Sequence, residues 1–377
     1  MWFRFACIGC IQGSALPAWT VSNAIGDGSE PTSPKLQSFN GEEIPNGQAG
    51  VEMSLTDSRF QNVLVGIDFS PSADAALKQA VWLAQKNAAK IVLVHALRDL
   101  RQAMHRASYE SRLDFLYGEG LKFQREIRQE SDAKMRQIVA PFASAGLDVK
   151  CETLLGDPFV ALIHAAQAEG SDLVIVGTRG LSTWQQLLMG STAKKLIRKC
   201  PASVWTVTAK HVDVPKVVLA ATDFSEVSRK AVLQGLEIAE LSGATLHLLH
   251  VIDAADVPDG LFQTATEGTS LRQEVNRVAK EHLERFIDSL GIAPGRIQPH
   301  LTYGTPWQEI NRLADHLNAD LIAIGTVGHS GIQELLLGTT AERVLDVCNS
   351  SILTVKPDGF VSPIEPASWP PLTPAAE

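Results

Sequence analysis

The sequence lacks the long apolar run that a membrane-spanning helix requires, and it lacks an excess of positive charge. No stretch of its 377 residues approaches the roughly 20 apolar residues of a membrane span. Lysine and arginine number 33, against 42 aspartates and glutamates, which gives a net charge of −9. A chain this acidic does not predict the basic surface that broad nucleic-acid binding needs. We therefore expect neither a membrane nor a nucleic acid as a partner.

Cysteine is also scarce, since the five cysteines are an odd number without the spacing of a disulfide framework. Cys151, Cys200 and Cys348 are typical of buried, reduced thiols, which predicts a cytoplasmic location. A C-x-x-C near the N-terminus has no strand before it, as a thioredoxin-like site would require. The first ten residues resemble an export signal only loosely, because Arg4 interrupts a short apolar stretch.

Several common catalytic motifs are missing. The sequence contains no G-x-x-x-x-G-K-[ST] of P-loop proteins, no H-E-x-x-H, no Cys–His zinc spacing and no G-x-S-x-G. No motif places a pair of carboxylates for acid–base chemistry. We therefore expect no catalytic residue and no metal site.

The two ends of the chain differ in composition from the middle. Residues 1–58 are rich in glycine, serine, proline and asparagine without sustained periodicity, which predicts a disordered or mis-annotated extension. A start at Met53 is the alternative interpretation. Residues 358–377 are rich in proline and predict an extended tail.

Between these ends the same landmarks occur twice in the same order. Each copy opens with an apolar strand that ends in Asp-Phe-Ser, with the aspartates at Asp68 and Asp223. Each aspartate is followed 27 residues later by a histidine, His95 or His250. An internal repeat of this kind predicts two related domains. We place them at residues 59–209 and 214–357.

Apolar strands and helical patterns alternate within each copy. Ser70 is a good helix cap, and Pro71 is suited to the first helical position. Long helices are predicted at about 121–145 and 271–290. Continuous apolar strands separated by helices predict a parallel sheet that is covered on both faces. The expected fold is α/β, with two tandem doubly wound, Rossmann-like domains whose ligands lie beyond the carboxyl ends of the strands.

A glycine pattern, G-x-x-G-x9-G-[S/T], also occurs twice, each time just after a hydrophobic strand. Glycine allows positive φ and a close approach of the backbone to a ligand. The last Gly-Ser or Gly-Thr precedes a helix, whose first N–H groups attract anions. The alternative is a tight turn with helix capping. We interpret the pattern as a phosphate loop, one per copy, with these members: Gly177, Gly180, Gly190 and Ser191; Gly325, Gly328, Gly338 and Thr339.

The polar residues near the loops have competing interpretations. Asp68 and Asp223 could accept a hydrogen bond from an adenine amino group or could cap the next helix. We expect His95 and His250 to be packed residues, and we expect no catalysis by His329 in the second loop.

The charge near the two loops differs. The first loop and its helix carry cations, and the second carries mixed charge, which predicts tighter triphosphate binding at the first site. The first loop and its helix contain Arg179, Lys194, Lys195, Arg198 and Lys199, and the second loop and its helix contain Val327, Glu342, Arg343 and Asp346.

Several motifs of the repeat resemble the universal stress protein family. They are the repeated Asp-Phe-Ser, the Leu-Leu-His-Val-Ile-Asp at 248–253, the Gly-x-Pro at 156–158 and 304–306, and both glycine loops. The resemblance covers residues 60–357 and is strongest to the tandem, type-E members. It implies an adenine nucleotide alpha hydrolase-like fold that binds ATP or AMP, with Mg²⁺ as a companion ion. It implies these nucleotide contacts: Asp68, Ala96, Val176, Gly177, Gly180, Gly190, Ser191 and Thr192 in the first domain; Asp223, Val251, Ile324, Gly325, Gly328, Gly338, Thr339 and Thr340 in the second.

Some positions depart from the family pattern. Gly66 and Ala221 stand where ATP-binding members often have proline, and Ala96 replaces a common valine. Ser351 replaces a proline before the last strand, the strand through which family members commonly dimerise. In a tandem chain the two domains can pair in this way, which gives an intrachain pseudo-dimer, and we also expect a homodimer.

The resemblance implies a cytoplasmic, ATP-binding protein of stress response and regulation, in which the nucleotide changes conformation or assembly. It is not expected to be an enzyme beyond weak ATP hydrolysis. Two alternatives are a slow ATPase or phosphotransfer enzyme of the same fold, and a nucleotide-free interaction protein.

Overall fold

The computed structural model describes most of the repeated region and nothing of the predicted extension up to residue 58. All described residues belong to one compact unit, Asn40–Glu377. The loop residues Arg179, Gly180 and His329 lie outside the description. The described ranges are 60–99, 114–178, 189–209, 214–253, 267–292, 295–328 and 337–365.

Ten strands form a single sheet in the order β3-β2-β1-β4-β5-β10-β9-β6-β7-β8. Within each half all strands are parallel, and β1 or β6 lies between its second and fourth strands. The strands are β1 Asn62–Ile67, β2 Lys90–Leu97, β3 Val149–Leu155, β4 Leu173–Gly177, β5 Ser203–Val207, β6 Val217–Thr222, β7 Thr245–Asp253, β8 Ile297–Gly304, β9 Leu321–Gly325 and β10 Ser351–Val355. The predicted doubly wound α/β fold is therefore confirmed.

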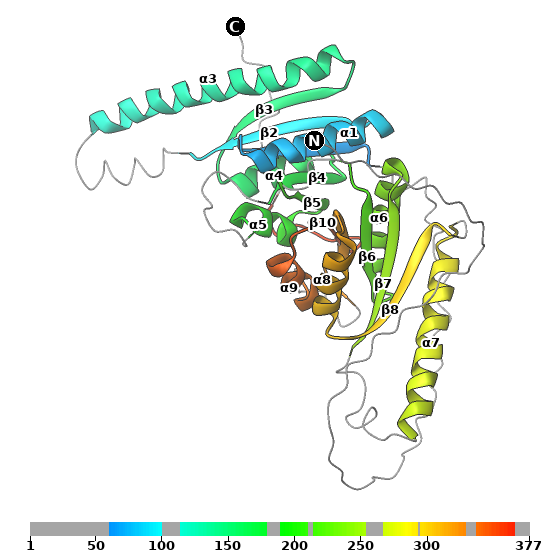
Figure 1. Ribbon diagram of the computed structural model, residues 1–377. Helices are drawn as coiled ribbons and strands as arrows, with labels where there is room; N and C mark the ends of the chain where they lie inside the picture. Colours follow the sequence, from blue (N-terminus) through cyan, green and yellow to red (C-terminus); the bar gives the residue numbers. More distant parts are fainter. Residues whose placement is uncertain are drawn as a thin grey trace, which may run out of the picture. The chain divides into compact units, whose positions relative to one another are not determined.

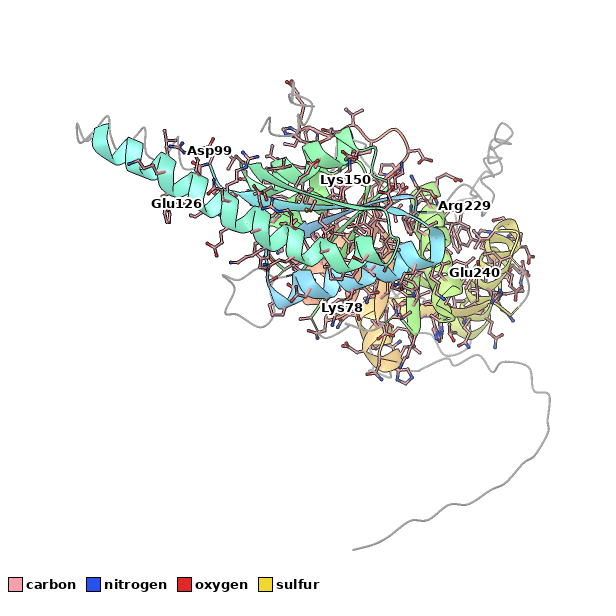
Figure 2. The ribbon with its side chains drawn as sticks, turned by 90° about the horizontal axis from the view of Figure 1, so that it is seen from above. Lys78, Asp99, Glu126, Lys150, Arg229 and Glu240 are labelled. Carbon is pink, nitrogen blue, oxygen red and sulfur yellow. The ribbon has the colours of Figure 1, made fainter. Side chains whose placement is uncertain are left out.

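Helices cover both faces of this sheet (Figure 1). One buried cluster packs α1, α3, α6 and α7 on the first face, and a second cluster packs α4, α5, α8 and α9 on the other. Charged side chains such as Lys78, Glu126 and Glu240 are exposed on the outer sides of the helices (Figure 2). The helices are α1 Pro71–Asn87, α3 Asp114–Ser144, α4 Pro158–Ala168, α5 Ser191–Lys199, α6 Glu226–Ser242, α7 Glu267–Ser289, α8 Pro306–Leu317 and α9 Thr339–Val347.

The helix starts follow the local sequence signals. Ser70 and Ser225 accept N–H groups of Ala73 and Ser228 at 3.2 Å, and Pro71 occupies the first turn of α1 as predicted. The long helices α3 and α7 begin at Asp114 and Glu267, earlier than the predicted 121 and 271. Periodicity located these helices but not their first turns.

The two halves join where β5 and β10 pair antiparallel in the middle of the sheet. The pairing is nearly symmetric, because Thr206 Oγ1 donates to the Ile352 carbonyl and Thr354 Oγ1 donates to the Val204 carbonyl, at 3.2 and 3.1 Å. Both threonines are buried. Each of the two hydrophobic clusters contains residues of both halves. The halves therefore share their core.

The chain that follows β10 returns to the first half. Lys356 is buried, and its Nζ donates to the Arg198 carbonyl at the end of α5, at 3.0 Å. Burial lowers the pKa of Lys356 to about 8. Ile364 packs against the cluster around α4, and His164 Nε2 lies 3.0 Å from the Glu365 carbonyl. The described part of the predicted extended tail is thus held against α4 at Ile364 and Glu365.

Candidate functional site

The aspartate after the first strand of each half organises a tight turn. Asp68 Oδ1 accepts the Ser70 N–H at 3.0 Å, and Asp223 Oδ1 accepts the Ser225 N–H at 3.1 Å. Asp223 Oδ1 also accepts the Ser225 hydroxyl at 2.6 Å. One carboxylate oxygen therefore holds the turn before the helix, whereas the helix itself is capped by Ser70 or Ser225. The same bond fixes where the carboxylate lies at the sheet edge.

The residue after each aspartate is a phenylalanine in the left-handed region, with φ of 61° at Phe69 and 65° at Phe224. This backbone is costly for a bulky side chain. Each ring packs on the strand histidine, with centroids 4.5 Å apart for Phe69 and His95 and 4.2 Å for Phe224 and His250. The sequence interpretation missed this role, although the repeated Asp-Phe-Ser was its signal.

The strand histidines are packed residues, as expected. Nδ1 of His95 and of His250 lies 2.7 and 2.9 Å from the carbonyl oxygens of Ile67 and Thr222. Because a carbonyl only accepts, Nδ1 carries the proton in both rings. Burial lowers the pKa of His250, which favours the neutral ring.

Each glycine loop is closed by the same two backbone hydrogen bonds. In the first half Thr178 N–H donates to Val207 O at 2.9 Å, and Gly190 N–H donates to Thr178 O at 2.7 Å. Thr326 and Gly338 repeat both bonds in the second half, at 2.9 and 2.7 Å. The start of α5 or α9 is thereby fixed beside the end of β4 or β9.

The helices that follow the loops start without a side-chain cap. Gly190 and Gly338 are their N-cap residues, and neither supplies an acceptor from a side chain. The first N–H groups of an α-helix have no intrahelical acceptor. Ser191 and Thr339 are exposed, and Thr192 and Thr340 are half-buried. The two helix starts therefore present donors to an anion.

The glycines at the strand ends are required by packing within the protein. A Cβ on Gly177 would lie 2.5 Å from Ser72 Oγ and 2.8 Å from the Ser72 carbonyl carbon. A Cβ on Gly325 would lie 3.0 Å from a methyl group of Val227. None of the loop glycines that the structure describes has positive φ, so a left-handed backbone is not the reason for glycine at these positions. The first helix of each half packs too closely for a side chain.

Two glycines of the second loop mark the space beside Asp223. A Cβ on Gly328 would overlap the Asp223 carboxylate, so this aspartate and the loop are in direct proximity. A Cβ on Gly338 would meet Thr326 O at 3.4 Å and Val327 Cα at 3.7 Å, which are ordinary contacts. The described part of the chain thus gives no packing reason for glycine at 338. A ligand that approaches the backbone would give one.

The apolar residues of the predicted site are mostly turned into the protein. Val176 and Ile324 are buried in the cluster that packs α4, α5, α8 and α9. Ala96 and Val251 are half-buried and pack against the same cluster. Only the backbone at Val176 and Ile324 reaches the sheet edge, whereas Ala96 and Val251 keep part of their side chains exposed.

The cations of α5 do not form the phosphate-directed group that their number suggested. Lys194 Nζ lies 2.6 Å from Asp346 Oδ1 in α9, and Arg198 pairs with Glu342 in the same helix. Lys195 Nζ lies 3.8 Å from an Asp157 oxygen. Nζ of Lys195 and of Lys199 lie 4.4 and 5.4 Å from the ring centre of Phe159. Lys194 and Arg198 are thus engaged by α9, whereas Arg179, on which the predicted preference for a triphosphate also rests, lies outside the described residues.

Within the described ranges, no cluster of three His, Cys, Asp or Glu side chains is arranged to hold a metal ion. Among the same residues, no helix combines the length and apolar composition of a membrane span.

The sequence model of the Universal stress protein family matches residues 59–208 and 215–356. The chain belongs to this family. The two matches correspond to the two halves of the sheet, each with its own aspartate turn and glycine loop.

Curated relatives extend this similarity over nearly their whole length. Universal stress protein E of Photorhabdus laumondii is 28% identical over 327 residues, covering 82% of this chain and 99% of the relative. Universal stress protein E of Escherichia coli is 27% identical over 321 residues, covering 81% and 97%. This chain is thus similar to the tandem, type-E proteins.

Solved structures show the same fold. A putative universal stress protein from Pseudomonas aeruginosa UCBPP-PA14 has a TM-score of 0.55 at 23% identity, covering 80% of this chain and 95% of its own. A protein from strain PAO1, described as functionally unknown, has a TM-score of 0.56 at 23% identity, covering 81% and 95%.

Proposed function

We propose that the chain binds an adenine nucleotide, ATP or AMP, at the glycine loops and acts in a cytoplasmic stress response through nucleotide-dependent conformation or assembly. The observation that carries the proposal is Gly338, a helix N-cap without a side chain where the described atoms leave room for one. The N–H groups of Thr339 and Thr340 would receive the phosphates. Mg²⁺ would accompany them, since it binds phosphate oxygens and water readily.

The adenine end of this proposed site would lie toward the aspartate turn. Asp223 lies against Gly328 of the loop, which supports a ligand that spans from the carboxylate to the helix start. An adenine amino group could donate to the carboxylate. The first half repeats the turn at Asp68 and the loop closure at Gly190, which supports a second site of the same kind.

The assembly part of the proposal follows from the central strands. β5 and β10, the last strands of the two halves, are paired with each other. This supports the intrachain pseudo-dimer. A homodimer of the chain would therefore have to use another surface than these strands.

Calorimetry with ATP tests the proposal in the variants Gly190→Leu and Gly338→Leu. Each leucine side chain would occupy the space of the phosphates, so each variant should lose one binding event. Thr305→Leu is the matched control, because Thr305 is the N-cap of α8 and also makes no side-chain cap bond. Unchanged ATP binding in both glycine variants would refute the proposal. Mg²⁺-dependent phosphate release that Gly190→Leu abolishes would favour the slow-ATPase alternative.

A further inference from the structure

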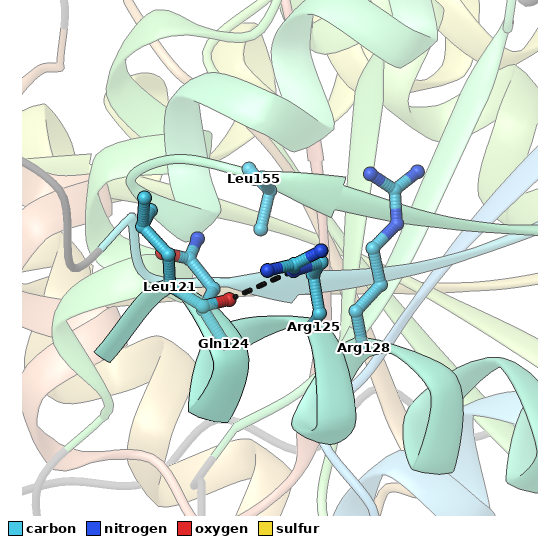
Figure 3. A pocket seen from close by; sticks show the side chains of 5 residues that line it. All are labelled: Leu121, Gln124, Arg125, Arg128 and Leu155. Atoms are coloured by element: carbon cyan, nitrogen blue, oxygen red, sulfur yellow. Dashed lines mark hydrogen bonds between the residues drawn. The ribbon is translucent and has the colours of Figure 1, made fainter. Parts of the chain in front are cut away.

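A pocket of about 280 Å³ lies between α3 and the end of β3, at the outer edge of the first half. Gln124 and Arg125 of α3 lie opposite Leu155 of β3, with Leu121 and Arg128 of the same helix on either side (Figure 3). Leu155 faces this pocket, whereas its neighbour Leu154 packs in the cluster around α4 on the opposite side of the sheet. The pocket is lined by Leu121, Gln124, Arg125, Arg128 and Leu155. It is thus small, partly apolar and cationic.

Gln124 is the unusual member of this lining. The residue is only 7% exposed, yet neither Oε1 nor Nε2 of its side chain has a hydrogen-bond partner in the described structure. A buried amide without partners is costly, and native proteins rarely leave one. A ligand that both accepts and donates a hydrogen bond would satisfy such an amide fully, and a ligand that only accepts would satisfy Nε2.

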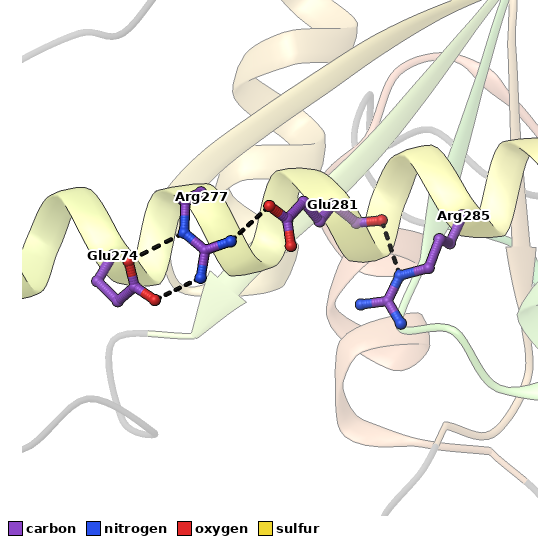
Figure 4. A network of polar contacts seen from close by, with 4 residues as sticks. All are labelled: Glu274, Arg277, Glu281 and Arg285. Atoms are coloured by element: carbon purple, nitrogen blue, oxygen red, sulfur yellow. Dashed lines mark hydrogen bonds and ion pairs between the residues drawn. The ribbon is translucent and has the colours of Figure 1, made fainter.

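Within the described ranges, neither arginine of the pocket has a partner of opposite charge. Arg125 Nε donates to the Leu121 carbonyl at 3.3 Å, and no carboxylate among the described residues pairs with Arg125 or Arg128. The corresponding helix of the second half differs. There Arg277 bridges Glu274 and Glu281 at 2.5 Å each, and Arg285 donates to the Glu281 carbonyl (Figure 4). Charge on α7 is balanced within the helix, whereas charge at the α3 pocket is not.

The pocket is separate from the proposed nucleotide site. β3 is the outermost strand of its half, and β2 lies between it and β1, the strand that leads to Asp68. Strands in a sheet are about 4.8 Å apart, so β3 lies about 10 Å from the strand that leads to Asp68 and one strand spacing from Ala96 on β2. Leu155 faces α3, whereas Ala96 packs against the cluster on the opposite side of the sheet. A nucleotide at the glycine loop would leave this edge accessible.

We propose that this pocket binds a small organic anion, in which a carboxylate or phosphate group is attached to an apolar body. The anionic oxygens would accept from the guanidinium groups of Arg125 and Arg128 and from Nε2 of Gln124. The apolar body would lie against Leu121 and Leu155. The ligand supplies a negative charge that the pocket lining lacks and an acceptor for Nε2 of the buried amide.

Glutamine side-chain NMR tests the proposal on the full chain. The amides are labelled with ¹⁵N, and the signal lost in Gln124→Met identifies Gln124. Phenyl phosphate and hexanoate are titrated separately to distinguish the two anionic groups, with 1-hexanol as the neutral probe. At least one anion should shift the Gln124 signal, and 1-hexanol should not.

Variants sharpen the test. Arg125→Ala and Arg128→Ala should each weaken the anion about tenfold, as expected for loss of a charge-assisted hydrogen bond. Arg136→Ala is the matched control, because Arg136 is exposed on the same helix outside the pocket and should leave the affinity unchanged. Gln124→Met should abolish the amide contact and raise the melting temperature of the free protein, since it removes unpaired buried groups.

Three results would overturn the proposal. The first is a Gln124 signal that neither anion moves. The second is an equal response to 1-hexanol, which would show apolar partitioning alone. The third is a lower melting temperature in Gln124→Met, which would show that the amide is satisfied within the protein.

Discussion

The helices that follow the two glycine loops occupy matching places in the two halves and carry opposite charges at two corresponding positions. Lys194 and Arg198 on α5 correspond to Glu342 and Asp346 on α9, 148 residues later. The contacts are diagonal, Lys194 with Asp346 and Arg198 with Glu342, as approximate twofold symmetry requires. Two copies of the first half would place Lys194 against Arg198. The duplicated halves have therefore become complementary, and the charge difference favours the pairing of unlike halves.

Other differences between the halves concern single backbone and side-chain positions. Helix α1 ends in a left-handed Ala88, whereas α6 ends in a left-handed Gly243. Position 152 on β3 is a glutamate, and the corresponding position on β8 is His300. Substitutions can test separately the backbone features that the two halves share and the side chains that differ between them.

The largest effect is expected at the strand pair that joins the halves. Leu353 is fully buried opposite Trp205, so Leu353→Ala should lower the free energy of unfolding by about 2–5 kcal/mol. Because both clusters span the halves, urea unfolding should remain one transition. Val361→Ala, at a residue that is 84% exposed, is the control. Two separate transitions would show that the halves fold independently.

Glycines of the same loop pattern should respond differently to alanine. Gly177→Ala places a Cβ against Ser72 and should cost about 1–3 kcal/mol of stability. Gly338→Ala meets only ordinary contacts and should cost about 0.5–1 kcal/mol, as for a helix cap. Thermal unfolding of both variants makes the comparison. Equal losses would remove the distinction between a packing glycine and a ligand glycine.

Acid should weaken the second half through His300. Its ring lies 2.8 Å from His247, and burial together with His247 and His316 lowers the pKa of His300 from 6.5 to about 4. As the pH falls, His300 is protonated in the unfolded chain before it is protonated in the folded protein. The free energy of unfolding therefore decreases as the pH drops from 6.5 to 4. Solvent screening at this half-buried ring limits the loss to about 1–2 kcal/mol.

The contribution of Glu152 to the pH dependence of stability has the opposite sign to that of His300. Burial raises the pKa of Glu152, so the folded protein binds this proton more readily than the unfolded chain, and this contribution increases as the pH falls. Urea unfolding at pH 7 and pH 5 should show a smaller difference in His300→Gln than in the wild type. An unchanged difference would place the acid sensitivity elsewhere.

The helix ends offer a reciprocal pair of substitutions. Ala88 has φ of 53°, so Ala88→Gly should stabilise the protein by about 0.5–1 kcal/mol after the entropy of glycine is included. Gly243 has φ of 71° and open space around it, so Gly243→Ala should destabilise by a similar amount. Melting temperatures that move in the same direction for both variants would contradict this interpretation.

The smallest effect is expected for the ion pairs between α5 and α9. Their side chains are 38–47% exposed, and such pairs contribute about 0.2–1 kcal/mol. Lys194→Glu should destabilise by this amount at low salt, and Asp346→Lys in the same chain should restore it. If this double-mutant cycle shows no coupling between Lys194 and Asp346, the ion pair does not stabilise the protein, and the interpretation of Lys194 as a phosphate-directed cation regains support.

Features set by local chemistry could be predicted from the sequence. The cap Ser70, the alternation of strands and helices, and the repeated Asp-Phe-Ser all depend on neighbouring residues. The strand histidines His95 and His250 were also correctly expected to be packed.

Features set by distant partners could not be predicted. The partners of Lys194 and Arg198 lie 152 and 144 residues away, and only the β5–β10 pairing brings them together. The need for glycine at 177 comes from the approach of α1, which the loop pattern does not encode. The left-handed Phe69 and Phe224 depend on a ring contact across the sheet edge.

Native mass spectrometry tests most directly the claim that both loops bind an adenine nucleotide through the same backbone geometry. The full chain with ATP should carry two nucleotides, Gly190→Leu and Gly338→Leu should each carry one, and the double variant should carry none. An unchanged number of bound nucleotides in the double variant would contradict the claim.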